Sequence, residues 1–88
     1  MRLNEIKAYL IDNGYNDTVI LENPNYETAI IGISHNGQLI YSYNQMVECL
    51  ENNENMTEDE AIEFIDYNTI RSLPYMGDKQ PIICMTLC

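Results

Sequence analysis

Residues 56–85 read MTEDEAIEFIDYNTIRSLPYMGDKQPIICM, and this stretch decides the fold that the sequence predicts. Thr57 followed by Glu60 is the pattern of a capping box, in which each side chain accepts a hydrogen bond from the other residue's backbone N–H. The apolar residues that follow recur at helical spacing, which predicts a helix over residues 58–73. Pro74 should end this helix, because proline has no N–H to donate and its ring clashes with the preceding turn.

The two sides of this predicted helix differ in charge. Its apolar side is formed by Ala61, Ile62, Ile65, Thr69 and Leu73. Asp59, Glu63 and Asp66 form an acidic stripe on another side. Ile70 falls among these acids, where an apolar residue gains nothing in a monomer, so a loop or a partner is expected to cover it.

Two polar residues of the same helix are expected to hold the loop that follows. Asn68 falls toward the apolar side, and a buried amide needs hydrogen-bond partners, which the backbone of residues 74–81 would supply. Arg71 lies four residues after Tyr67 and seven after Phe64, so its guanidinium can stack on a ring.

The end of the stretch predicts a buried strand. Residues 82–88, IICMTLC, are apolar on both faces apart from Thr86, and Pro81 is tolerated as the first residue of a strand. Strands that are apolar on both faces usually lie inside a sheet. We therefore expect a central position for this strand.

The residues upstream predict a helix over residues 2–12, a short strand over residues 18–21 and a hairpin over residues 29–43. Asn36-Gly37 predicts a two-residue type I′ turn, which pairs His35 with Gln38 and places Ile33 opposite Ile40. A second helix, capped by Ser42 or alternatively Asn44, is expected to run to about residue 52.

The two faces of the hairpin are unlike. Ile31, Ile33 and Ile40 share one face, which is expected to pack on the helices. Leu39 and Tyr41 share the other face, which is expected to be partly wet because tyrosine has an apolar ring and a polar tip.

Together these elements predict one α+β domain over residues 1–88, with three helices and a mostly antiparallel four-stranded sheet in the order α-β-β-β-α-α-β. No apolar run approaches about 18 residues, and the N-terminus lacks the apolar core of a signal peptide. The three cysteines, an odd number without C-x-x-C spacing, favour free thiols in a reducing, cytoplasmic location.

Charge is the property that departs furthest from the average. Fourteen acids oppose four bases, giving a net charge of −10, and no Lys or Arg lies between Lys7 and Arg71. Eight of the acids fall within residues 48–66. A field of this sign repels nucleic acid and anionic membranes and attracts basic protein surfaces.

No motif predicts an enzyme, a cofactor or a metal site. His35 is the only histidine and has no catalytic partner in an evident motif. Cys84 lies in an apolar strand with no base nearby in the sequence to activate its thiol. Residues 52–60 offer oxygen ligands but lack the spacing and the glycine of a calcium-binding EF-hand loop.

Part of the chain resembles a known group of proteins. The pattern G-x-x-x-x-G-x-x-I-Y-x-Y-x-x-M-V-E, followed by IDYNTIRSLPYMG and PII, is similar to short acidic proteins of low-GC Gram-positive bacteria and their phages or other mobile elements. The resemblance covers residues 25–85, with IDYNTIR-x-LPY as its specific part. It implies a mobile-element setting, in which small acidic inhibitors of host nucleases such as anti-CRISPR and anti-restriction proteins are common, and it carries over no functional residue.

These observations favour a small acidic protein of a phage or mobile element that binds another protein. The expected partner is a host protein that handles nucleic acid, whose basic surface the carboxylates would occupy as a nucleic-acid mimic. The expected partner-binding residues are Glu48, Glu51, Glu58, Asp59, Glu63, Asp66 and Ile70. The alternative is a regulatory or ligand-binding module whose acidity serves only solubility.

Overall fold

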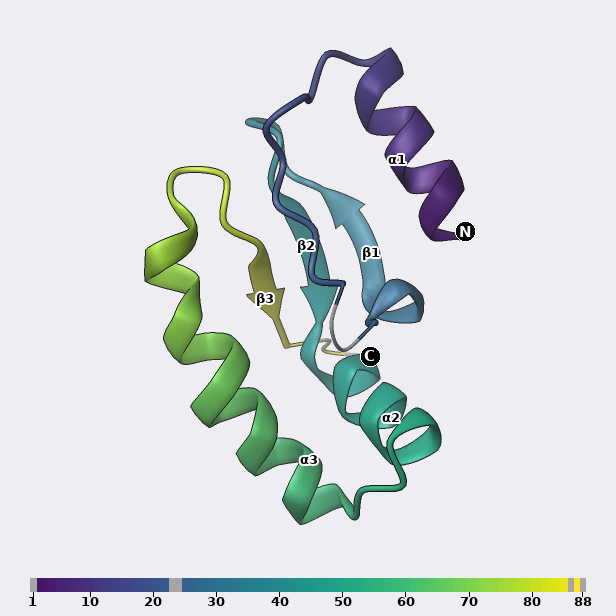
Figure 1. The fold of residues 1–88 in the computed structure, drawn as a ribbon, viewed down its shortest axis with the longest axis vertical. Coiled ribbons are helices and arrows are strands. Elements are labelled where there is room, and N and C mark those ends of the chain that lie inside the picture. Colours follow the sequence, from purple (N-terminus) through teal and green to yellow (C-terminus); the bar gives the residue numbers. More distant parts are fainter. Residues whose placement is uncertain (1, 23–24, 86, 88) are drawn as a thin grey trace.

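In the computed structural model, which describes residues 2–22, 25–85 and 87, the chain forms three α-helices and a three-stranded sheet (Figure 1). The α-helices are α1 (Leu3–Asp12), α2 (Tyr43–Asn53) and α3 (Glu58–Phe64), and the strands are β1 (Ile30–Ile33), β2 (Leu39–Ser42) and β3 (Ile82–Cys84). Three shorter helical segments are η1 (Glu27–Ala29), the π-helix η2 (Ile65–Ile70) and the 3₁₀-helix η3 (Leu73–Met76). The α+β class and the three helices are as predicted.

The sheet is mixed, in the order β1-β2-β3, which corrects the prediction of a mostly antiparallel one. β1 and β2 are antiparallel, but β2 and β3 are parallel. The parallel pair follows from the connection between them, because α2, α3 and η2 return the chain to the end of the sheet at which β2 began. In the order β1-β2-β3, β3 is an edge strand, and its residues are half-buried. The predicted central position of this strand is therefore wrong. Thr86 and Cys88 of the predicted strand lie outside the described residues.

The predicted strand at residues 18–21 is also wrong. The sheet formed by the described residues therefore has three strands instead of the four expected. Three separate hydrogen bonds hold this segment instead. The Thr18 hydroxyl donates to the Gly37 carbonyl at 2.7 Å, and the Leu21 N–H donates to the Tyr41 hydroxyl at 3.0 Å. The Val19 N–H donates to the Lys79 carbonyl at 3.4 Å. These bonds reach three separated parts of the chain, so they form no ladder.

The hairpin between β1 and β2 forms with a different turn from the one predicted. The Gly37 N–H donates to the Ser34 carbonyl at 3.0 Å, and the Ser34 N–H donates to the Gln38 carbonyl at 2.7 Å. A type I′ turn requires positive φ at both of its central residues, here Asn36 and Gly37. Gly37 has a φ of +87°, but Asn36 is not among the described residues with positive φ, so the predicted type I′ turn is wrong. The register therefore shifts, and Ile33 pairs with Leu39.

The core contains the hairpin face that was expected to be partly wet. Tyr41 is 0% exposed and Leu39 is 2% exposed, whereas Ile31 on the aliphatic face is 49% exposed. The Tyr41 ring meets the buried Tyr26 ring edge to face, with 6.4 Å between centroids. Tyr41 can be buried because its hydroxyl is satisfied by Leu21, so no polar group is stranded in the core.

Helix α2 lies as the sequence predicts, with Ser42 as its cap. The Ser42 side chain accepts from the Gln45 N–H at 3.4 Å, which identifies Ser42 rather than Asn44 as the N-cap. The predicted apolar side is buried and consists of Met46, Val47, Cys49 and Leu50.

The Thr57–Glu60 capping box at the start of α3 is confirmed. The Thr57 N–H donates to Glu60 Oε1 at 2.9 Å, and the Glu60 N–H donates to Thr57 Oγ1 at 3.2 Å. The predicted continuous helix over residues 58–73 is wrong, because it changes to the π-helix η2 at Ile65. Pro74 does not end the helical path but lies in the first turn of η3.

The π-helix changes which residues face the core. A π turn contains more residues than an α turn, so positions after Ile65 rotate away from where a regular wheel places them. Ile70 is half-buried and packs against the core cluster, so it does not lie on the acidic side as expected. Asn68 is exposed, which corrects the prediction that it is buried against the loop. Arg71 stacks as predicted, 4.7 Å from the centroid of the Tyr67 ring.

Candidate functional site

The candidate site is a surface of carboxylates on α2, α3 and η2. We call it the acidic face, and it consists of Glu48, Glu58, Asp59, Glu63 and Asp66, all exposed. The two α-helices meet at the turn over residues 54–57, and η2 continues the path of α3 past β3 (Figure 1). Glu51, also predicted to bind a partner, is half-buried at the margin of this surface.

The local sequence explains why these carboxylates point into solvent. On α2, the buried positions Met46, Val47 and Leu50 orient the helix, which leaves Glu48 on the opposite side. On α3, burial of Ala61 does the same for Glu63, and the capping box fixes where the helix begins. Acids in the first turn, including Asp59, also interact favourably with the positive end of the helix dipole.

No basic side chain forms an ion pair with the acidic face within the described residues. The one ion pair found there joins Lys7 Nζ to Glu22 Oε1 at 2.6 Å, on and beside α1. Arg71 stacks on the Tyr67 ring and the Lys79 amine donates to the Asn36 carbonyl, and neither forms an ion pair with the acidic face. The negative field of this surface is therefore directed at solvent.

One carboxylate of the acidic face has a neutral partner. The Tyr43 hydroxyl, on α2, donates to Asp66 Oδ1 at 3.2 Å and so links α2 to η2. Burial raises the pKa of Tyr43, and the charge and hydrogen bond of Asp66 raise it further. Asp66 is consequently a structural link as well as a surface charge.

A hollow of about 410 Å³ adjoins the acidic face and combines carboxylates with aromatic rings. It is lined by Met56, Glu60, Glu63, Phe64, Tyr67 and Asn68. A cationic side chain is the group that carboxylates and ring faces both attract. Of these residues only Glu63 was predicted as a binding residue. The spacing of Glu60, Phe64, Tyr67 and Asn68 along one side of a helix is the signal that could have identified the others.

The groups most often used in catalysis are dispersed. Residues 2–22, 25–85 and 87 contain no group of three His, Cys, Asp or Glu side chains placed to hold a metal ion. His35 is exposed next to the hairpin turn, and the buried Cys49 shares a hydrogen bond of 2.9 Å with the Thr28 hydroxyl. The chemistry that the arrangement offers is electrostatic attraction between the carboxylates of the acidic face and cationic groups of a partner.

None of the helices in the described part of the chain is long and apolar enough to cross a membrane. Comparison with protein families, curated proteins and solved structures gives no match for this chain.

Proposed function

We propose that the protein binds a basic surface of another protein through the acidic face. The partner is a host protein that handles nucleic acid, and the carboxylates occupy the positions that phosphates would take. In the mobile-element setting that the sequence resemblance implies, the binding inhibits a defence function of the host.

The observation that carries this proposal is the absence of basic partners for the acidic face among the described residues. The carboxylates of α2, α3 and η2 project outward, and the one ion pair of that part of the chain lies elsewhere, at Lys7 and Glu22. A surface of uncompensated like charge attracts a complementary surface and increases the rate of association. It also repels nucleic acid, so a protein partner fits better than DNA or RNA.

The hollow beside Phe64 supports the same reading. Its Phe64 ring, with Glu60 and Glu63, offers an inserted Lys or Arg side chain a ring face and carboxylates. Arg71 on Tyr67 is an example, within this chain, of the contact that such a side chain would make.

The experiment is capture of partners on immobilised protein from a lysate of a low-GC Gram-positive bacterium. The variant E48Q/D59N/E63Q removes three charges from the acidic face. The control D12N/D17N/D78N removes three exposed acids elsewhere and so has the same net charge. We expect the wild type and the control to retain a nucleic-acid-binding protein that the acidic-face variant loses.

Two further conditions test the mimicry. The captured protein should leave the column between low and moderate salt, since screening shortens the Debye length from about 30 Å at 0.01 M to about 8 Å at 0.15 M. Duplex DNA should also displace the immobilised protein from its partner. Equal capture by both variants would favour the alternative, in which the acidity serves solubility alone.

A further inference from the structure

The hollow beside Phe64 lies where α3 changes to η2. Glu60, Glu63 and Phe64 belong to α3, and Tyr67 and Asn68 belong to η2. π-Helices are rare in proteins, and short π turns occur frequently at functional sites. The hollow therefore coincides with the point at which the helical path departs from α geometry.

Acceptor oxygens surround an aromatic ring in this hollow. The exposed side chains of Glu63 and Asn68 form no hydrogen bond or ion pair within the described residues. Glu60 uses Oε1 to accept from the Thr57 N–H at 2.9 Å, which leaves its other carboxylate oxygen for a ligand. The half-buried Phe64 ring packs against the core, and this contact fixes its position. The hollow thus combines a fixed ring with acceptors that have no donor in the chain.

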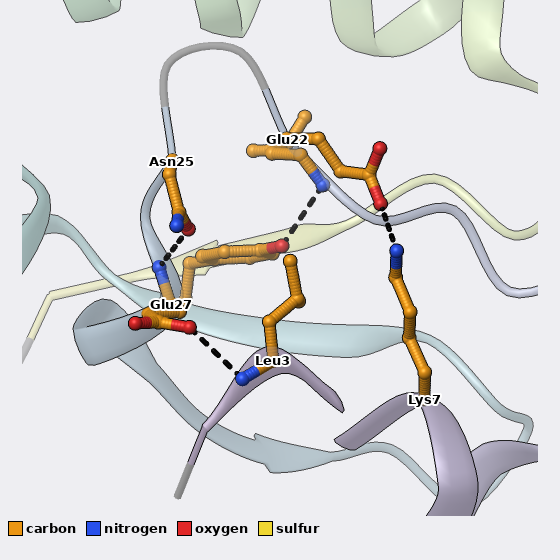
Figure 2. A network of polar contacts seen from close by, with 7 residues as sticks. Leu3, Lys7, Glu22, Asn25 and Glu27 are labelled. Atoms are coloured by element: carbon orange, nitrogen blue, oxygen red, sulfur yellow. Dashed lines mark hydrogen bonds and ion pairs between the residues drawn. The ribbon is translucent and has the colours of Figure 1, made fainter. Parts of the chain in front are cut away.

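No basic side chain of the described residues lines the hollow. Lys7 pairs with Glu22 at 2.6 Å, beside α1 (Figure 2). Arg71 lies over the Tyr67 ring, 4.7 Å from its centroid, and so covers one face of that ring. Phe64 is therefore the ring that a cation from outside the chain would use.

We propose that the hollow takes an arginine side chain of the partner, an inference that rests on the proposed function. The guanidinium stacks on the Phe64 ring and donates a parallel pair of N–H bonds to the Glu63 carboxylate. A further N–H of the same group donates to the Asn68 side-chain oxygen. An arginine that binds phosphate through two parallel bonds can bind a carboxylate in the same way, so the contact suits a surface that normally holds nucleic acid.

Lysine fits this hollow less well than arginine. The lysine ammonium is a compact and strongly hydrated charge, whereas the guanidinium is planar, more weakly hydrated and carries its N–H groups in a rigid fork. A planar group can lie on a ring while its edge donates to acceptors at the side. The hollow should therefore distinguish two cations of equal charge, which the general field of the acidic face does not do.

Two peptides of equal charge test the inference on the full chain. They are acetyl-Gly-Arg-Gly-amide and acetyl-Gly-Lys-Gly-amide, titrated while NMR follows the backbone amides and the side-chain amide of Asn68. We expect a dissociation constant at least about threefold lower for the arginine peptide, with the largest saturable shifts at Phe64, Tyr67 and Asn68. Equal dissociation constants, or shifts spread evenly over the acidic face, would overturn the proposal.

Single substitutions identify the groups that hold the peptide. Glu63 and Asn68 are exposed, so Glu63→Gln and Asn68→Ala should keep the wild-type melting temperature. Each should raise the dissociation constant of the arginine peptide by about threefold or more. Asp17→Asn is the matched control for Glu63→Gln, because it removes one exposed acid outside the hollow and should leave that constant unchanged. Binding of the arginine peptide to both hollow variants as tightly as to Asp17→Asn would also overturn the proposal.

This inference and the proposed function can fail separately. The peptide titration needs no partner protein, and the capture of a partner needs no peptide. Capture through the acidic face without selectivity for the arginine peptide would contradict the inference alone. Selectivity for the arginine peptide without any captured partner would contradict the proposed function alone.

Discussion

The hydroxyl of Tyr41, at the centre of the core, accepts a hydrogen bond of 3.0 Å from the backbone N–H of Leu21. The bond joins the middle strand of the sheet to a segment that belongs to no strand. It satisfies two polar groups at once, the buried phenol and a half-buried amide. The position of Leu21 therefore depends in part on one side chain of the core.

Tyr41→Phe should lower the free energy of unfolding by about 1–2 kcal/mol, because it leaves the Leu21 N–H without its acceptor. Urea denaturation followed by far-UV circular dichroism measures the change. Tyr75→Phe is the control, and since Tyr75 is 90% exposed it should stay within about 0.5 kcal/mol of the wild type. Equal effects of the two substitutions would show that the Tyr41–Leu21 bond contributes nothing.

The buried tyrosines should make the fold sensitive to alkali. Burial raises the pKa of Tyr26 and of Tyr41 above the ordinary value of 10.0. The phenols then ionise first in the unfolded chain, so the stability they contribute is complete below about pH 10 and declines as the pH rises toward their folded pKa values.

Unfolding measured from pH 8 to pH 11 should show this decline, and it should be shallower in Tyr41→Phe, which has one fewer buried phenol. A free energy of unfolding that stays flat above pH 10 would contradict the burial of both rings.

The Thr57 cap should contribute measurably to the free energy of unfolding. Thr57→Ala removes the acceptor of the Glu60 N–H and should cost about 1 kcal/mol. Thr57→Ser keeps the hydroxyl and should stay near the wild type. Thermal and urea unfolding compare the three proteins, and an alanine variant as stable as the serine variant would show that the capping box is not needed.

Ile70→Ala should destabilise the chain by about 1–2 kcal/mol, because Ile70 is half-buried against the core. Ile11→Ala is the matched control. Ile11 is 69% exposed, and its truncation should change stability by less than about 0.5 kcal/mol. If Ile70→Ala left stability unchanged but weakened partner binding, Ile70 would be a surface contact, as the regular helical wheel had suggested.

What the sequence could predict depended on near neighbours. The capping box of Thr57 and Glu60 and the buried side of α2 need only residues within one or two helical turns, and both were found as expected. The exposure of the acidic face was also accessible, since unpaired carboxylates are rarely buried.

What the sequence could not predict depended on distant contacts. An apolar segment such as residues 82–84 gives no signal of which strand it will pair with, and its parallel pairing at the edge follows from the long helical connection. The burial of Tyr41 required Leu21, twenty residues away, to satisfy its hydroxyl. In the π-helix over residues 65–70, Ile70 and Asn68 lie on other sides than expected. A helical wheel assumes a constant number of residues per turn, so it cannot predict this change.

The central claim, that the acidic face binds a basic partner, is tested most directly by association kinetics with the captured protein. E48Q/D59N/E63Q and D12N/D17N/D78N are compared at several salt concentrations, after equal melting temperatures are confirmed. Because both have the same net charge, any difference reports where the charges lie. The account predicts that the acidic-face variant associates more slowly than the control, with a weaker dependence on salt. Equal association rates and affinities for the two variants would contradict it.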